Sequence, residues 1–184
     1  QEGFVSGAVY HGEREHIEFL DRVYALHSQC NPLHADLWPS IVKFESEVVA
    51  MTGHMLGGEH VDGGVCGVMT SGGTESILLA VKTARDKMRA DRPEIKAPEM
   101  VLPLTAHPAF RKAGAYFDVK PVFVPFDRET FKADVDAMRE AITDNTILLV
   151  GSAPGYAQGV VDPIAEIGSL AQEKDLLFHV DGCV

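Results

Sequence analysis

The sequence alternates short apolar runs with longer stretches of helical spacing, and this alternation limits the possible folds more than any other feature. Strands are expected at 65–69, 100–104, 119–124, 146–150 and 176–180, and helices at 74–90, 107–116, 134–142 and 163–174. Strands separated by helices of this length are joined by right-handed crossovers into a mostly parallel sheet. The runs ILLVGSA and LLFHVD are almost wholly apolar, as in strands covered on both faces. The sequence therefore predicts an α/β fold with helices on both faces of the sheet.

Two further helices are expected before this alternation begins. Residues 13–28 and 40–56 carry apolar side chains every three or four positions, which is typical of amphipathic helices. A glycine pair ends the second of them. At the other end of the chain, Asp162 is predicted to cap the last helix, with Pro163 as its first residue.

Charge and cysteine content exclude several classes of function. The net charge of −11, with no basic run, argues against nucleic acid and anionic membrane surfaces as partners. No apolar stretch approaches the roughly 18 residues needed to span a bilayer. The 3 cysteines are widely spaced, so neither a disulfide framework nor a structural zinc site is expected. The histidines form no ligand-like motif, so we expect no metal site. The cysteine spacing fits a reducing, cytoplasmic compartment. A membrane anchor before Gln1 is left open.

The stretch GVMTSGGTESILLAVKTAR passes from an apolar run through Ser71-Gly72-Gly73-Thr74 into an amphipathic helix. Adjacent glycines let the backbone turn tightly and approach a ligand closely. The start of a helix offers unpaired N–H groups and a positive dipole end, which together bind phosphate. Two interpretations stay open: anion capture, or a tight turn in which Ser71 or Thr74 caps the helix. The spacing matches neither of the common nucleotide-binding glycine motifs.

Two other predicted strand ends carry side chains suited to ligand binding. Asp181 ends an apolar run, where a carboxylate is costly unless it has a partner. It either caps a following helix or faces a ligand cation. His107 follows the predicted strand at 100–104 and is either a capping residue or a ring in a site. Ligands of open α/β sheets bind beyond the carboxyl ends of the strands. A phosphate cradle, a carboxylate and an aromatic ring there describe a pocket for pyridoxal phosphate.

Several motifs occur in an order that resembles a known family. They are SGAVY (6–10), NPLHADLWP (31–39), VMTSGGTESILLA (68–80), AHPAF (106–110), GSAPGYAQGVVDPI (151–164) and HVDGCV (179–184). Together they resemble the sphingosine-1-phosphate lyase family of the group II pyridoxal-phosphate-dependent decarboxylase superfamily, along the whole chain. TSGGTES and HVD are shared with glutamate and aromatic amino-acid decarboxylases, whereas SGAVY and NPLH are specific to the lyases.

This resemblance implies a fold-type-I enzyme that uses pyridoxal phosphate and acts as a homodimer with its active site at the subunit interface. It implies cleavage of a phosphorylated long-chain (sphingoid) base between C2 and C3, which releases a fatty aldehyde and phosphoethanolamine. Residues 1–58 would form an N-terminal helical segment. Residues 59–184 would form the first part of the large cofactor-binding domain, so that the fold is incomplete in this chain.

The resemblance also implies roles for residues around the cofactor. Gly73 and Thr74 resemble the contacts to its phosphate. His107 resembles the ring that stacks on the pyridine, and Asp181 resembles the partner of the pyridine nitrogen. Cys183 corresponds to a residue on the opposite face of that ring.

A second group of residues is expected to meet the substrate. Tyr10, Asn31 and His34 resemble the residues that line the phosphate end of the substrate. Tyr156 resembles a catalytic tyrosine near the reacting hydroxyl, beside the expected catalytic roles of His107 and Asp181. Several relatives have Phe-Pro-His where this chain has Tyr-Ala-Gln at 156–158, a departure that suggests a bacterial-type branch.

The family's Schiff-base lysine follows a later strand, after a histidine, and no lysine of this chain lies in that context. We therefore expect residues 1–184 to be part of a longer enzyme and to be inactive alone. Two alternatives remain. A group II amino-acid decarboxylase is disfavoured by NPLH and Tyr10, because a carboxylate substrate has no phosphate to hold. A non-catalytic α/β module that binds a phosphate or a partner would explain the missing lysine.

Overall fold

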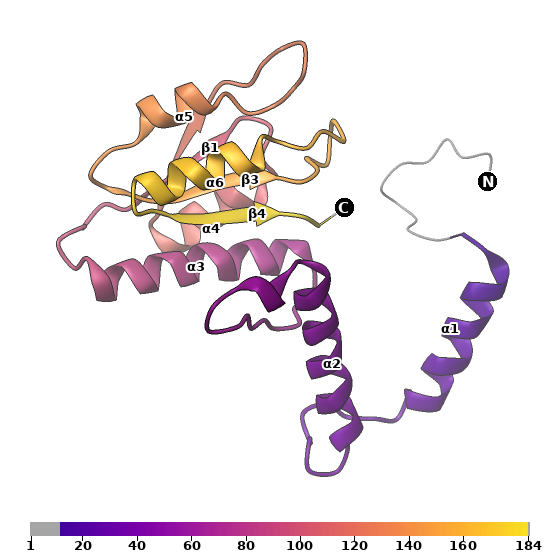
Figure 1. Ribbon diagram of the computed structural model, residues 1–184. Helices are drawn as coiled ribbons and strands as arrows, with labels where there is room; N and C mark the ends of the chain where they lie inside the picture. Colours follow the sequence, from indigo (N-terminus) through magenta and orange to yellow (C-terminus); the bar gives the residue numbers. More distant parts are fainter. Residues whose placement is uncertain (1–11, 184) are drawn as a thin grey trace. The chain divides into compact units, whose positions relative to one another are not determined.

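The computed structural model describes residues 12–183, and within them it contains a four-stranded parallel sheet (Figure 1). The strands are β1 (Glu99–Pro103), β2 (Lys120–Val124), β3 (Thr146–Ser152) and β4 (Leu177–Asp181), in the order β2-β1-β3-β4. The helices are α1 (Arg14–His27), α2 (Pro39–Met55), η1 (Gly58–His60), α3 (Gly73–Asp91), α4 (Ala109–Phe117), α5 (Val135–Ala141) and α6 (Ile164–Glu173). The predicted α/β class and parallel sheet are confirmed.

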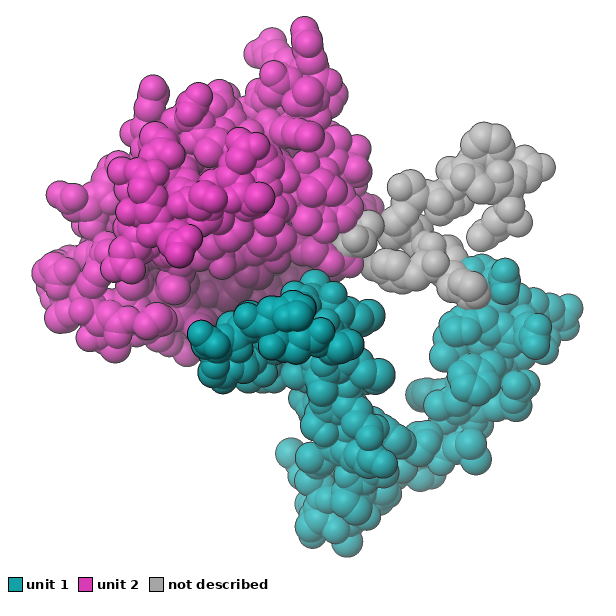
Figure 2. All heavy atoms as spheres, in the orientation of Figure 1, with its two compact units in different colours: residues 1–70 teal, residues 71–184 magenta. Residues whose placement is uncertain are grey.

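The chain divides into two compact units, Gln1–Thr70 and Ser71–Val184, which Figure 2 colours separately. The second unit holds the whole sheet and helices α3 to α6. The proposed domain boundary between residues 58 and 59 stays a prediction about the longer protein. None of the helices in residues 12–183 is long and apolar enough to cross a membrane.

Two apolar layers cover the sheet of the second unit, because alternate strand residues point to opposite faces. On one face α3 and α4 pack against side chains that include Met100, Leu102 and Val150. On the other face α5 and α6 pack against side chains that include Val101 and Leu149. These five strand side chains are fully buried. The prediction of helices on both faces is confirmed (Figure 1).

The predicted strand at 65–69 is wrong. No strand among residues 12–183 pairs with this run, and Val65, Val68 and Met69 are exposed. A strand forms only where another strand accepts and donates its backbone hydrogen bonds, and apolar side chains alone do not supply that partner. The Met69 amide donates instead to the Glu45 carboxylate, at 3.4 Å. Helix α3 therefore follows a loop and not a strand.

The predicted start of the last helix is also wrong. Helix α6 begins at Ile164 with Pro163 as its N-cap, and Asp162 does not cap it. The physical reason is that Asp162 is already held elsewhere. Its amide donates to the Ser152 carbonyl at 2.9 Å, and its buried carboxylate accepts from the amides of Ser152 and Ala133.

The first unit contains both predicted N-terminal helices within a residue or two of their expected bounds. Gly57 follows α2 with φ of 77°, the left-handed conformation expected of a glycine after a helix. Neither helix has a buried residue. Their apolar side chains, Phe19, Leu20 and Phe44 among them, are about half exposed.

Two helical glycines of the second unit allow a matched test of packing. A Cβ on Gly114 of α4 would lie 2.6 Å from the Val119 carbonyl oxygen, whereas a Cβ on Gly168 of α6 would lie 3.6 Å from the Phe178 ring. Alanine favours a helix over glycine by about 1 kcal/mol, but overpacking costs about 1–3 kcal/mol. Gly114→Ala should lower the free energy of unfolding, and Gly168→Ala should leave it unchanged or raise it, as urea unfolding would measure. Equal effects of the two substitutions would contradict this packing.

Candidate cofactor site at the carboxyl ends of the strands

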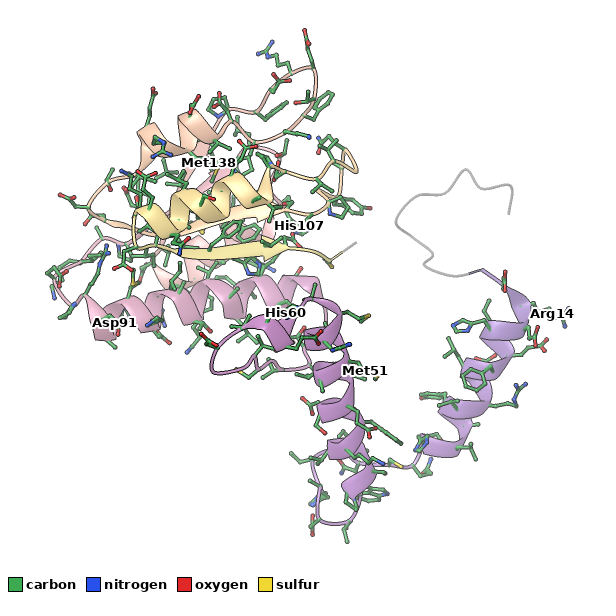
Figure 3. All side chains as sticks on the ribbon, viewed as in Figure 1. Arg14, Met51, His60, Asp91, His107 and Met138 are labelled. Atoms are coloured by element: carbon green, nitrogen blue, oxygen red, sulfur yellow. The ribbon has the colours of Figure 1, made fainter. Side chains whose placement is uncertain are left out.

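The predicted site residues of the second unit gather at one edge of the sheet. Parallel strands bring their carboxyl ends to the same edge, and His107 lies beyond β1 there (Figure 3). Ser152, the last residue of β3, is paired with Asp181, the last residue of β4. The Ala153 amide donates to the Asp181 carbonyl at 2.8 Å, so this pairing continues one residue beyond β3.

The start of α3 lies against the residues that follow β4. A Cβ built on Gly73 would lie 2.7 Å from Sγ of Cys183, closer than real Cβ contacts come. Gly72 has a different requirement, because its φ of 152° and ψ of 176° are open only to glycine. The adjacent glycines thus have separate causes: the first allows the turn, and the second makes room for the sulfur. The structure brings Gly73 and Cys183 together, and the cofactor roles assigned to them stay predictions.

The first turn of α3 is suited to an anion. The amides of Gly73 and Thr74 have no acceptor inside the helix, and a helix of 19 residues places a positive dipole end there. The N-cap residue of α3 is Gly72, and no side-chain hydrogen bond caps the helix at this position. The alternative in which Ser71 or Thr74 is the cap is therefore wrong.

Glu75 lies beside the candidate site, and no role was predicted for it from the sequence. Its carboxylate accepts the Ser71 amide at 2.6 Å. Hydrogen bonds from the Ser71 side chain and backbone hold the pKa of Glu75 below its usual value. Glu75 therefore fixes the turn before α3 without occupying the amides of Gly73 and Thr74. The four-residue spacing from Ser71 to Glu75 is close to that of a capping box and could have identified it.

Asp181 and His107 are each oriented by one backbone amide. Oδ1 of Asp181, which is half-buried, accepts from the Cys183 amide at 3.2 Å, and Oδ2 makes no hydrogen bond within residues 12–183. Nδ1 of His107 accepts from the Ala109 amide at 3.1 Å. In its neutral form the His107 ring therefore carries its proton on Nε2.

Tyr156 lies in the loop that follows β3. A bridge between Gly155 and Val160 closes this loop, and Tyr156 is 61% exposed. Among the described residues no hydrogen bond or ring contact joins Tyr156 to His107 or Asp181. The structure thus places Tyr156 beyond the same edge of the sheet without bringing it into contact with them.

The residues assigned to the substrate phosphate belong to the first unit. Asn31 and His34 share the turn between α1 and α2, where the His34 amide donates to the Asn31 carbonyl at 3.0 Å. Oδ1 of Asn31 accepts from the Leu33 amide at 3.1 Å, so this oxygen is used inside the turn. Tyr10 lies outside the described residues.

His179 on β4 is a titratable group that lies close to the site. Its ring lies edge-on to Phe110, with centroids 5.9 Å apart. Burial lowers the pKa of His179, and the nearby Asp181 carboxylate opposes that shift only in part. The neutral ring is therefore the form that the fold favours.

The contact between Gly73 and Cys183 is testable by a double-mutant cycle. Gly73→Ala should lower the free energy of unfolding by about 1–3 kcal/mol, because its Cβ meets the sulfur. Cys183→Ala leaves only the Cβ of residue 183, 3.8 Å away. In that background Gly73→Ala should cost little, which gives a coupling energy of at least about 0.5 kcal/mol. If the cost of Gly73→Ala is independent of residue 183, the contact is absent in solution.

His179 should make stability fall below neutral pH. An unfolded histidine has a pKa of about 6.5, and the folded value is lower. The stabilising contribution is therefore complete well above pH 6.5 and decreases as the pH falls through that value, by at most about 1.4 kcal/mol per pH unit. Urea unfolding at pH 7.5 and 5.5 should show this loss, and His179→Gln should reduce it. An unchanged pH dependence in the variant would assign the loss to other groups.

Comparisons with known proteins agree with the resemblance seen in the sequence. Residues 8–184 match the model of the pyridoxal-dependent decarboxylase conserved domain. The chain is 47% identical to the sphingosine-1-phosphate lyase of Arabidopsis thaliana and 46% identical to lyase 1 of Rattus norvegicus, over its full length. It covers 34% and 31% of these two proteins, so it spans about a third of the curated relatives' length.

Solved structures show the same relation. The fold superposes on a sphingosine-1-phosphate lyase of Burkholderia pseudomallei with a TM-score of 0.92 and 46% identity, covering 97% of this chain and 42% of that one. A glutamate decarboxylase of Lactobacillus brevis matches with a TM-score of 0.75 at 20% identity, over 94% of this chain and 41% of that one. That second likeness shows the shared fold alone. The domain match and the parallel sheet together show that the chain belongs to the pyridoxal-dependent decarboxylase family.

Proposed function

We propose that the full-length protein is a pyridoxal-phosphate-dependent lyase that cleaves a phosphorylated sphingoid base to a fatty aldehyde and phosphoethanolamine. The observation that carries this proposal is the similarity to sphingosine-1-phosphate lyases, at 47% identity over the whole chain. The structural likeness to the Burkholderia enzyme supports it. The decarboxylases that match at 20% identity support the fold and not this substrate.

The residues at the carboxyl edge of the sheet fit the family's cofactor. The first amides of α3 suit its phosphate, and Gly73 presents no side chain in their way. Asp181 has one oxygen already oriented by the Cys183 amide and a second oxygen that could accept from the pyridine N–H. When bound, pyridoxal phosphate supplies an electron sink for breaking a bond to the carbon that bears the amine.

Each of these side chains would then have a specific task. Asp181 would keep a proton on the pyridine nitrogen, because a nearby carboxylate favours the charged form of that ring. His107 would stack on the ring, in the orientation that the Ala109 amide sets for it. Tyr156, at the end of the loop beyond β3, would meet the C3 hydroxyl of the substrate, whose proton must leave when the C2–C3 bond breaks.

The phosphate of the substrate would be held by residues of the first unit. We infer this role for Tyr10, Asn31 and His34. A charge-assisted hydrogen bond from a protonated histidine to a phosphate is worth about 1.5–3 kcal/mol. That corresponds to roughly ten- to a hundredfold in affinity, which is enough to favour a phosphorylated base over an unphosphorylated one.

A homodimer is the assembly that these features favour. The apolar faces of α1 and α2 have no buried residue, although their spacing is that of helices packed against a partner. Exposed apolar surface of this extent is typical of protein interfaces. A second copy that covers these helices would agree with the active site at the subunit boundary that the resemblance implies.

Asp181→Asn in the full-length protein tests the proposed function. The amide cannot keep the pyridine nitrogen protonated, so release of fatty aldehyde should fall by orders of magnitude while the fold persists. Asp175→Asn is the matched control. It removes an exposed carboxylate at the other end of β4, at a position with φ of 53° that asparagine tolerates. Its turnover should stay near that of the unmodified protein.

The same assay separates the proposal from its alternatives. Release of carbon dioxide from an amino acid, with no aldehyde from the phosphorylated base, would identify a decarboxylase. Absence of both products, with no cofactor absorbance in the purified full-length protein, would identify a non-catalytic module. Near-normal cleavage by Asp181→Asn would remove Asp181 from its proposed role and leave the activity in place.

A further inference from the structure

Asp162 is a buried carboxylate whose two oxygens both accept backbone amides. Only 5% of the residue is exposed. Oδ1 accepts from the Ala133 amide at 2.9 Å, and Oδ2 accepts from the Ser152 amide at 2.8 Å. We call these two hydrogen bonds the Asp162 clamp. A buried carboxylate without partners is costly, so the clamp accounts for an acidic side chain in this position.

The clamp acts at the end of β3 that borders the site. Ser152 is the last residue of that strand and is paired with Asp181. The Asp162 amide also donates to the Ser152 carbonyl at 2.9 Å, so residues 152 and 162 are joined by two hydrogen bonds in opposite directions. The next amide, that of Ala153, donates to the backbone carbonyl of Asp181. The clamp and the backbone of Asp181 therefore bind adjacent residues of the chain.

The loop with Tyr156 lies between the two joined residues. Residues 152 and 162 form its base, and the bridge between Gly155 and Val160 narrows it further along. Tyr156 itself is 61% exposed, and its side chain makes no hydrogen bond or ring contact within residues 12–183. The position of Tyr156 therefore depends on how firmly the base of the loop is held.

A second buried carboxylate provides a comparison within the same sheet. Glu99 begins β1, at the opposite end of the sheet from the site, and is 8% exposed. It is bonded to the Lys120 ammonium and the Thr143 hydroxyl, at 2.8 and 2.7 Å. Asp162 accepts from the Ser152 amide at the end of β3 and from the Ala133 amide in the segment before α5, and from no cation in the described part of the chain. Both are satisfied buried charges, but only Asp162 touches the backbone of the site.

We propose that Asp162 is a positioning residue that holds the carboxyl end of β3 and the Tyr156 loop beside Asp181. The proposal rests on the proposed function for its catalytic consequence and on the hydrogen bonds of residues 133, 152 and 162 for its structural part. Loss of one clamp bond loosens the base of the loop. The fold can survive that loss, because strand pairing and most buried side chains of the two apolar layers lie outside the clamp, which touches one layer only at Ala133.

Asp162→Asn in the full-length protein tests this role, with Glu99→Gln as the matched control. The asparagine NH2 group faces an amide donor, so one clamp bond is lost with almost no change of shape. Hydrogen exchange of amides in 152–162 should become at least about tenfold faster. The kcat for the phosphorylated base should fall at least about tenfold, with KM within about threefold. Glu99→Gln should speed exchange near residues 99, 120 and 143 and leave both 152–162 and kcat unchanged.

Three outcomes would overturn the positioning role. In the first, Asp162→Asn speeds exchange but keeps the native kcat, which makes the clamp structural only. In the second, both variants lower kcat equally, which makes the effect one of stability. In the third, exchange at 152–162 is unchanged. If the native protein has no lyase activity, the proposed function fails, while the exchange comparison still decides whether the clamp holds the loop.

A measurement on the unmodified protein keeps the proposal falsifiable if Asp162→Asn does not fold. The amides of Ser152 and Ala133 should exchange as slowly as those in the centre of β3. Exchange of either amide at the rate of the exposed Tyr156 loop would show that the clamp does not persist in solution.

Discussion

Parallel pairing of β3 with β4 is the constraint on which the rest of the candidate site depends. Its register sets Ser152 opposite Asp181. Alternate residues of β4 face opposite layers: His179 lies against Phe110 of α4, whereas Phe178 lies against Gly168 of α6. A slip of one residue would move every side chain to the other face, and Asp181 would leave the side on which α3 begins.

The two ends of this sheet hold buried charge in different ways. At the amino end, burial alone would raise the pKa of Glu99, but hydrogen bonds from Lys120 and Thr143 hold it below the usual value. At the carboxyl end, the carboxylates meet backbone amides: Asp162 those of Ser152 and Ala133, and Asp181 that of Cys183. Amides carry no net charge, and within residues 12–183 neither carboxylate forms an ion pair with a lysine or arginine side chain. That is a suitable environment for a ligand with a protonated nitrogen.

Much of this arrangement could be predicted from the sequence, because it follows from local periodicity. The alternation of apolar runs and helical spacing predicted the α/β class and all the strands of the sheet. The strand predicted at 65–69 does not form, because a strand needs a second strand as its hydrogen-bonding partner. Whether such a partner exists is a non-local property, which a pattern of five residues does not contain. The capping role predicted for Asp162 is wrong for the same reason. An aspartate-proline pair indicates a helix cap only if no distant amide binds the aspartate carboxylate instead.

The site itself was predictable in type and not in detail. Glycines, a carboxylate and a histidine at expected strand ends indicated a pocket. The separate reasons for the adjacent glycines did not follow from sequence. Gly73 depends on the sulfur of a residue more than a hundred positions away, and Glu75 depends on how the chain turns at Ser71.

The Asp162 clamp has a consequence for the order in which the chain folds. It joins Asp162 to Ala133, 29 residues earlier, whereas the contacts within α4 or α6 span only a few residues. Closing a long loop costs more entropy than closing a short one, and contacts distant in sequence form more slowly. The single helices can therefore form before the clamp closes, but the sheet cannot, because β1 pairs with β3 across 47 positions, from Glu99 to Thr146. By loop length the clamp can close no later than the sheet, so the carboxyl end of β3 would be fixed while the core is still forming.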